Sequence, residues 1–249
     1  MKRKKNNSMT FVTTAIFLLT CTAGAVVQAT TGFGFGILCM AIFPYILPSY
    51  LQSTAVSSVC AATMSSMVAI RYRKYIRLKI IWPILAGYSV ASVWSIRFAK
   101  MQSDTVMVKF LGAVLILVSI YFFFFNDKIR VRPTILNGVI AGLIGGVGSG
   151  LFSIGGPPVV IYLMSALSDK DEYRACSLAY FAIGSWYVST ARWLNGVFDA
   201  QTVVLWMMAI VALGVGTFIG NCIFSRINAQ TLKRLVYCFM AISGVTMLF

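Results

Sequence analysis

The chain has 249 residues, of which 59% are hydrophobic and 11% charged, and its mean hydropathy is +0.85. A soluble domain carries about 25% charged residues, so the composition excludes an ordinary soluble protein and predicts a polytopic membrane protein. The net charge of +15 would suit a nucleic-acid-binding protein, but most of the lysines and arginines lie in tails and short loops between apolar segments. There they indicate orientation and contact with anionic lipid headgroups, and we expect no nucleic-acid partner.

The chain begins with a basic segment, MKRKKNNS at residues 1–8, which we expect to be a cytoplasmic tail. The apolar run that follows could be mistaken for a signal peptide, since small residues occur at Ala23 and Ala25. This run is longer than the roughly 7–15 apolar residues of a signal peptide and leads straight into further apolar sequence. We therefore expect no cleavage.

Apolar runs of about 20 residues, long enough to cross a bilayer, recur along the whole chain. They occupy residues 9–29, 51–70, 80–98, 106–125, 134–150, 175–191, 201–224 and 235–249. Two shorter apolar pieces, 35–49 and 157–167, each follow a glycine cluster. We expect an all-α integral membrane bundle with about eight crossings, four in each half, and two broken or re-entrant half-helices.

The two glycine clusters belong to similar segments half a chain apart. The first reads TTGFGFGILCMAIFPYILP from Thr30 to Pro48, and the second reads GSGLFSIGGPPVVIYLMSA from Gly148 to Ala166. Relative to alanine, glycine costs a helix about 1 kcal/mol and interior proline about 3 kcal/mol, so neither segment is expected to be one continuous helix. In lipid, a broken backbone is tolerated only where protein buries it or where it lines a cavity. Two such breaks in matching positions predict a transporter binding site.

The two halves can be laid over one another, which predicts an internal duplication. AKMQSDTVMVKFLGAVL, from Ala99, runs parallel to SRINAQTLKRLVYCFMAI, from Ser225, and Gly34 falls opposite Gly156. The expected organisation is a tail at 1–8, a first repeat at 9–126, a basic linker at 127–133 and a second repeat at 134–249. An odd number of crossings per repeat would invert the second copy, and an even number would make the copies parallel.

Charge in the loops bears on topology. Eight crossings with a cytoplasmic N-terminus place most of the 21 lysines and arginines inside. Ten crossings with the N-terminus outside do so equally well, but they export the MKRKK tail. Eight crossings fit better on that ground.

The inventory of reactive side chains argues against an enzyme. There is no histidine, and the carboxylates fall at segment ends or in loops: Asp104, Asp127, Asp169, Asp171, Glu172 and Asp199. No metal, cofactor or catalytic constellation can be assembled from them. Cation transporters commonly carry acidic groups at depth, so a cation substrate is disfavoured. The six cysteines lie in apolar segments without CxxC spacing and are expected to be packing residues.

An anion is easier to accommodate. A broken helix offers unsatisfied backbone N–H groups and the positive end of its dipole, and glycine lets a ligand approach that backbone closely. The candidate substrate-binding residues are Gln28, Thr30, Thr31, Gly32, Gly34, Gly36, Ser57, Ser149, Ser153, Gly155, Gly156 and Arg174. The alternative is that the glycines only permit close helix packing. Gln28 suits either role, and for Arg174 and Arg192 extension toward lipid headgroups is the favoured interpretation.

GFGFGILCMAIFPYILP and SGLFSIGGPPVVIYLM resemble the two signatures of the sulfite exporter TauE/SafE family, also called the toluene-sulfonate uptake permease family. The small-residue stretches STAVSS (53–58) and RACSLA (174–179) fit as well, and the resemblance covers the chain from about residue 10. It implies a secondary transporter of sulfite, organosulfonates or related small anions in the bacterial cytoplasmic membrane.

One departure from the family pattern lies in the helix after each glycine motif. Some members carry a lysine in the helix after each glycine motif, where this chain has Ser57 and Ser58 in the first half and Ala179 and Tyr180 in the second. If that lysine binds the anion, this protein must use backbone, hydroxyl or arginine groups instead.

Several alternatives stay open at this point. The solute could be another small anion or a neutral metabolite, and a non-transporting membrane scaffold is a less favoured interpretation. A homodimer is compatible with the sequence. The coupling ion and the direction of transport leave no mark in it.

Overall fold

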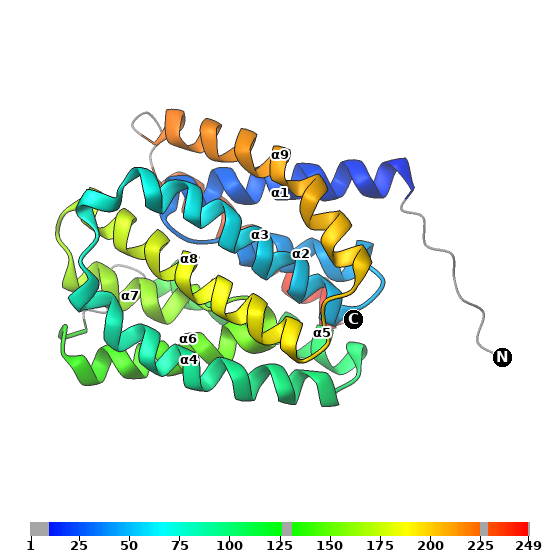
Figure 1. Ribbon diagram of the computed structural model, residues 1–249, viewed down its shortest axis with the longest axis horizontal. Coiled ribbons are helices and arrows are strands. Elements are labelled where there is room, and N and C mark those ends of the chain that lie inside the picture. Colours follow the sequence, from blue (N-terminus) through cyan, green and yellow to red (C-terminus); the bar gives the residue numbers. More distant parts are fainter. Residues whose placement is uncertain (1–9, 126–130, 225–228, 249) are drawn as a thin grey trace.

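The computed structural model describes residues 10–125, 131–224 and 229–248. This described part is a bundle of helices without β-strands (Figure 1). The helices of the first half are α1 (Phe11–Thr31), α2 (Phe35–Ile46), α3 (Tyr50–Arg71), the short 3-10 helix η1 (Arg73–Tyr75), α4 (Leu78–Met101) and α5 (Asp104–Phe125). Those of the second half are α6 (Ile135–Phe152), α7 (Gly156–Ala166), α8 (Lys170–Leu194), α9 (Ala200–Ile223) and α10 (Ala229–Leu248). The expected all-α membrane class is confirmed.

Among the described residues, six helices are long and apolar enough to cross a bilayer: α1, α3, α4, α5, α6 and α9. Helix α8 is longer still, with 25 residues, but it carries charges near both ends. At about 1.5 Å per residue, α2 and α7 are only about 18 Å and 17 Å long, short of the roughly 30 Å hydrocarbon core. The two short helices thus lie where the sequence predicts them, while the count of eight crossings stays a prediction.

Each short helix folds back on the helix before it. The first reversal uses two glycines with positive φ, Gly32 (+84°) and Gly34 (+110°), which bring the rings of Phe17 and Phe43 to 5.2 Å from one another. The second reversal uses a left-handed helix end, in which Ser153 has a φ of 56° and its N–H donates to the Ser149 carbonyl at 2.9 Å, while the Ile154 N–H donates to the Gly148 carbonyl at 3.1 Å. Helices α1 and α2, and likewise α6 and α7, are therefore antiparallel pairs.

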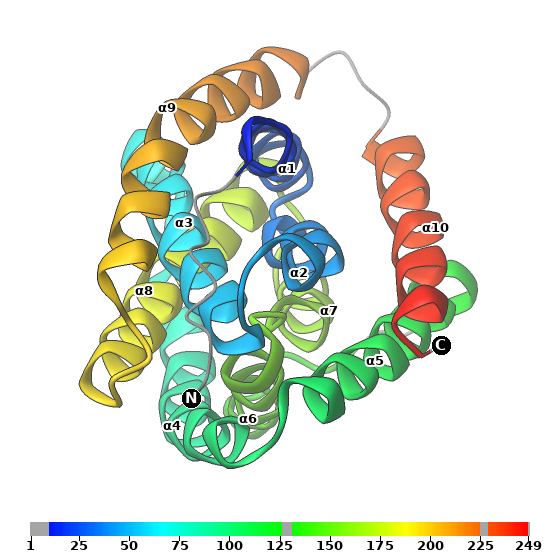
Figure 2. The ribbon, with the colours of Figure 1, turned by 90° about the vertical axis from the view of Figure 1, so that its right-hand side faces the viewer.

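The two halves exchange partners. Helix α4 of the first half packs most extensively on α6 of the second half, and α9 of the second half packs on α1 of the first. Small residues at both contacts let the helix backbones approach closely. Gly142 lies against the Ile84 backbone, and Gly216 lies against that of Thr22. Both pairs are parallel, whereas α3 with α8 and α5 with α10 are antiparallel (Figures 1 and 2). Such exchange is what two copies related by a two-fold axis across the helices would produce.

Seen end-on, α2 and α7 lie inside the bundle, while α5 and α10 form a pair at its side (Figure 2). Much of the interior is made of small or hydroxyl residues on α3 and α8. Many of these small residues are buried against neighbouring helices rather than facing lipid. The ends of α2 and α7 that carry the glycines therefore lie in the protein interior.

The helix directions differ from the expected topology in one respect. Helices α1 and α3 run parallel, with Gln28 beside Ser65, so both begin at the same end of the bundle and η1 lies at the other (Figure 1). In the expected topology of eight crossings with a re-entrant 35–49 segment, the start of α1 and residues 71–79 would instead lie on the same side of the membrane. The difference arises because α2 reverses the chain before α3 begins.

Candidate functional site

The two glycine breaks meet in the centre of the bundle. Gly36, in the first turn of α2, lies so close to the carbonyl oxygen of Ser153 that a Cβ at position 36 would overlap it. On the other side of this contact, Gly156 lies against Phe33. We call this meeting point of residues 32–36 and 153–156 the glycine crossing. Only glycine permits backbone to approach backbone this closely, which is the local reason for the two clusters.

A small cavity of about 30 Å³ lies at the glycine crossing. Its lining includes seven of the predicted site residues, namely Gln28, Gly34, Gly36, Ser149, Ser153, Gly155 and Gly156, together with Ile37, Ala61, Tyr88, Ile154, Phe181 and Ser185. A water molecule needs about 10–15 Å³ of such space, so the cavity has room for very few waters. The structure thus describes a closed centre, in which even a sulfite ion would need the surroundings to move.

Gln28 is one of the residues that the sequence left between two roles. Its side-chain oxygen accepts the N–H of Phe35 at 3.0 Å, and its nitrogen donates to the Ser65 hydroxyl at 2.6 Å. The side chain therefore occupies part of the N-terminus of α2, where free N–H groups were expected to meet an anion. In this closed arrangement Gln28 is a capping residue.

The second break offers fewer backbone donors than the first. Helix α7 starts with Gly156, Pro157 and Pro158, and proline has no N–H. A cradle of amides, as expected from the glycine motif, is therefore reduced at this position.

Arg192 of α8 supplies the positive charge beside the second break. Its guanidinium donates to the carbonyls of Ser149 and Gly150 at 2.9 and 3.1 Å and to the Ser153 hydroxyl at 3.0 Å. A further bond reaches the Thr54 carbonyl on α3 at 3.0 Å. By binding the Ser149 and Gly150 carbonyls, the guanidinium caps the C-terminal, negative end of α6. With 1% of its surface exposed, Arg192 does not extend to headgroups, and the favoured sequence interpretation of it is wrong.

Hydroxyl groups surround the glycine crossing. The hydroxyls of Tyr88 and Ser149 are 2.6 Å apart. By contrast, the buried hydroxyls of Ser57 and Tyr180 have no hydrogen-bond partner within the described part of the chain. Ser57 faces Gly36, and Tyr180 faces Gly145 on α6.

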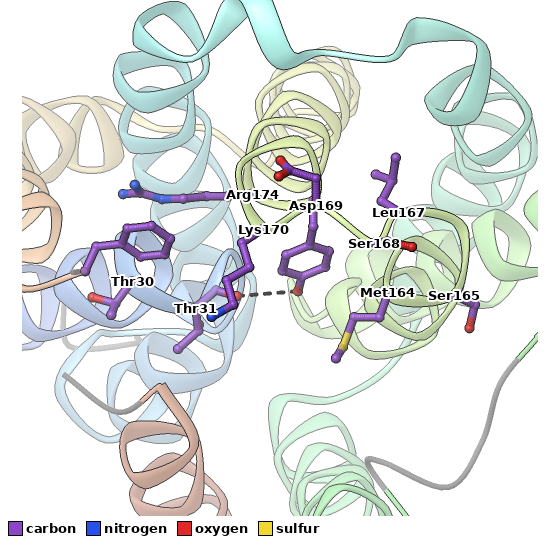
Figure 3. A pocket seen from close by; sticks show the side chains of 11 residues that line it. Thr30, Thr31, Met164, Ser165, Leu167, Ser168, Asp169, Lys170 and Arg174 are labelled. Carbon is purple, nitrogen blue, oxygen red and sulfur yellow. Dashed lines mark hydrogen bonds between the residues drawn. The ribbon is translucent and has the colours of Figure 1, made fainter. Parts of the chain in front are cut away.

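A larger cavity of about 480 Å³, which we call the vestibule, lies near the η1 end of the bundle (Figure 3). Three predicted site residues line it, Thr30, Thr31 and Arg174, together with Met164, Ser165, Leu167, Ser168, Asp169, Lys170, Tyr173 and Phe224. The sequence placed these three at one site with the glycines. The structure separates them from the seven that line the central cavity.

The threonine hydroxyls are already engaged. Thr30 donates to the Val26 carbonyl at 2.6 Å, and the Thr31 hydroxyl lies 2.9 and 2.6 Å from the carbonyls of Val27 and Phe33, to one of which it donates its single proton. Their expected role as extra donors to an anion is therefore not met in this arrangement. Gly32, between the two sites, has its carbonyl capped by the Ser177 hydroxyl at 2.7 Å.

Arg174 is buried as deeply as Arg192, with 1% of its surface exposed. It donates to the Tyr72 hydroxyl at 2.9 Å and to the side-chain oxygen of Asn221, and its guanidinium lies 4.1 Å from the centre of the Phe224 ring. Headgroup contact is excluded for this arrangement too. Asn221, for which the sequence favoured helix packing, serves as its acceptor.

Sequence reasoning weighed Arg192 as an anion-binding candidate but favoured headgroup contact for it, took Tyr180 for a packing residue, and did not consider Tyr88. An arginine near the end of an apolar helix is usually a headgroup contact, and the tyrosines look like packing residues. Nothing local in the sequence singles out Arg192, because Lys170 and Arg174 lie nearer to the second glycine motif along the chain.

The chain matches the family model described as "Sulfite exporter TauE/SafE" over residues 16–247. No curated protein and no solved structure matches it. The match spans both glycine breaks and all ten α-helices apart from the first residues of α1 and the last of α10.

Proposed function

Because the chain belongs to the sulfite exporter TauE/SafE family of membrane transporters, we propose that it is a secondary transporter of small sulfur-containing anions, such as sulfite or organosulfonates, in the bacterial cytoplasmic membrane. The observation that carries the proposal is the glycine crossing, where the broken helices of both halves enclose one small cavity lined in part by polar side chains. Interrupted helices at the interface of two repeats are where transporters bind their substrates. We propose no enzymatic activity.

Alternating access is the mechanism that suits this architecture. Helices α4 and α9 each pack on the first helix of the other half, so the two halves are joined as two interlocked units. Their antiparallel pairs α3–α8 and α5–α10 support an inverted duplication, with the repeats at 9–126 and 134–249. Rocking of one unit against the other would open the closed cavity to one side and then to the other.

The vestibule would be the entry on the η1 side. Lys170 and Arg174 give it two positive charges against the one negative charge of Asp169, whose carboxylate also caps α8 by accepting from the N–H groups of Asp171 and Glu172. Positive charge at a cleft raises the local concentration of anions. Gly32 and Tyr173 separate this entry from the central cavity.

For orientation, we propose that the η1 end faces the cytoplasm. More of the described cations lie at that end (Arg71, Arg73, Lys74, Arg77, Lys79, Arg132, Lys170 and Arg174) than at the other (Arg97, Lys100 and Lys109). Positive loops favour the cytoplasm. This replaces the expectation of a cytoplasmic N-terminus, since α1 begins at the opposite end.

The test is anion flux in proteoliposomes that contain the purified chain. Sulfite or methanesulfonate should move faster than in protein-free liposomes, and Gly36→Ala should abolish the flux because its Cβ overlaps the Ser153 carbonyl. Gly214→Ala is the matched control, since no atom lies within 4 Å of a Cβ there.

The outcomes separate the candidates. No flux of either anion, with carboxylate flux instead, would favour the transporter of another small solute. Full activity of a folded Gly36→Ala protein would contradict the role of the glycine crossing. Absence of any solute flux with a folded protein would favour the alternative of a non-transporting membrane scaffold.

A further inference from the structure

The charge on Arg192 has no anionic partner among the residues that the structure describes. Among the described residues, the ion pair formed is that of Arg77 with Glu172, at the η1 end. Every acceptor of the Arg192 guanidinium is neutral: the carbonyls of Thr54, Ser149 and Gly150 and the hydroxyl of Ser153. A buried charge without a counter-charge is costly, and neutral acceptors offset that cost only in part.

This charge lies beside the central cavity. Two of its acceptor residues, Ser149 and Ser153, line the cavity directly. No other described lysine or arginine lies at the glycine crossing, since Arg174 contacts Tyr72 and Asn221 near the η1 end. The centre therefore carries one positive charge.

Two hydroxyls at the crossing are independent signs of a ligand. Ser57 and Tyr180 are almost fully buried, with 0% and 1% of their surfaces exposed, and neither hydroxyl has a partner in the described protein. Burying a hydroxyl without a hydrogen bond costs free energy. Ser57 lies one helical turn after Thr54, on the α3 face that meets Arg192, and Tyr180 packs edge-on against Tyr88, a cavity residue.

We propose that Arg192 is the anion-selecting residue, that Ser57 and Tyr180 donate hydrogen bonds to the same anion, and that the centre prefers anions with a single negative charge. This inference rests on the proposed function and specifies its substrate class. A monoanion beside Arg192 makes a neutral pair, whereas a dianion leaves a net buried charge. On binding, the anion replaces part of the carbonyl set around the guanidinium, which can then move with the two halves.

The test compares a monoanion with a dianion on the purified full-length chain. Methanesulfonate and sulfate are suitable probes, because both are fully ionised at neutral pH. Methanesulfonate should raise the melting temperature in a concentration-dependent way, and sulfate at equal ionic strength should not. Arg192→Gln should remove this effect, while Arg192→Lys, which keeps the charge, should retain weakened binding.

The hydroxyl variants keep the test decisive if Arg192→Gln does not fold. Ser57→Ala and Tyr180→Phe break no hydrogen bond within the described protein, so their unliganded melting temperatures should equal or exceed that of the wild type. Each should raise the dissociation constant for methanesulfonate by on the order of 5-fold, the worth of one hydrogen bond. The matched control is Thr217→Val on α9, which removes another unpartnered hydroxyl and should leave binding unchanged.

Three results would overturn the inference while the proposed function stands. One is stabilisation by sulfate as strong as that by methanesulfonate. Another is wild-type affinity for methanesulfonate in both hydroxyl variants of a chain that transports sulfite. The third is no methanesulfonate binding by a chain that transports sulfite. A wild-type chain that moves no anion in liposomes would instead refute the proposed function.

Discussion

Gln28 joins the first glycine turn to the bundle through Phe35. Its oxygen accepts the Phe35 N–H at 3.0 Å while its nitrogen donates to Ser65 at 2.6 Å. One side chain thereby caps α2 and ties the α1–α2 reversal to α3. The start of α2 at Phe35 is thus held by a side chain seven residues before it.

Replacing Gln28 with alanine should destabilise the protein. The change leaves the buried Phe35 N–H without its acceptor, which costs about 1–3 kcal/mol. The melting temperature in detergent should fall accordingly. Gln52→Ala is the matched control, because that buried glutamine makes only long bonds of 3.4 Å to Asp199 and its oxygen has no partner in the described chain. An equal loss in both variants would contradict the capping role.

The parallel packing of α9 on α1 depends on Gly216. A Cβ at this position would overlap the Thr22 carbonyl and lie 2.8 Å from the Ala25 Cβ. Gly216→Ala should therefore destabilise the fold, by about 1–3 kcal/mol as overpacking does. Gly214→Ala, on the same helix but in open space, should be neutral or stabilising by up to about 1 kcal/mol.

Thermal unfolding of the two variants in the same detergent checks this prediction. Because both substitutions raise helix propensity equally, their difference reports the α1–α9 contact alone. Equal melting temperatures would show that α9 does not rest on α1 as described.

The sequence was sufficient for the helices and for the location of the breaks, because hydropathy and the glycine and proline penalties act locally. It could not show that Gly36 meets Ser153, since that contact depends on how the two halves pack together. For the same reason, the sequence could not show that Thr30, Thr31 and Arg174 line a different cavity from the glycines. For Arg192 the position near a helix end was misleading. Its burial depends on the C-terminus of α6, whose carbonyls accept its hydrogen bonds.

Asp199 makes the start of α9 sensitive to acid. Its carboxylate accepts the N–H and the hydroxyl of Thr202 at 2.7 and 2.6 Å. Partial burial acts to raise the pKa of Asp199, but the bonds from Thr202 and Gln52 together outweigh it and hold that pKa below its usual value. A lowered pKa in the folded state stabilises the protein above the unfolded value of about 3.9, and this stabilisation is lost as the pH falls through the folded pKa.

Asp199→Ala should thus lower stability at neutral pH by about 1 kcal/mol, as loss of an N-cap does. The difference from wild type should shrink on acidification below about pH 4. Melting temperatures over a pH series measure it. Asp199→Asn, which can still cap but does not titrate, is the control, and a difference between wild type and alanine that grows in acid would contradict the assignment.

The proposed orientation can be tested with a membrane-impermeant thiol reagent. The exposed Cys222 and Cys238 are first replaced by serine, since the other four cysteines are buried. Single cysteines are then placed at Tyr75 on η1 and at Ser103, between α4 and α5, both exposed and at opposite ends of the bundle. Because the η1 end carries more of the described cations, Ser103→Cys should react in intact cells. Tyr75→Cys should react only after the membrane is opened, and the reverse pattern would place the N-terminal end of α1 in the cytoplasm.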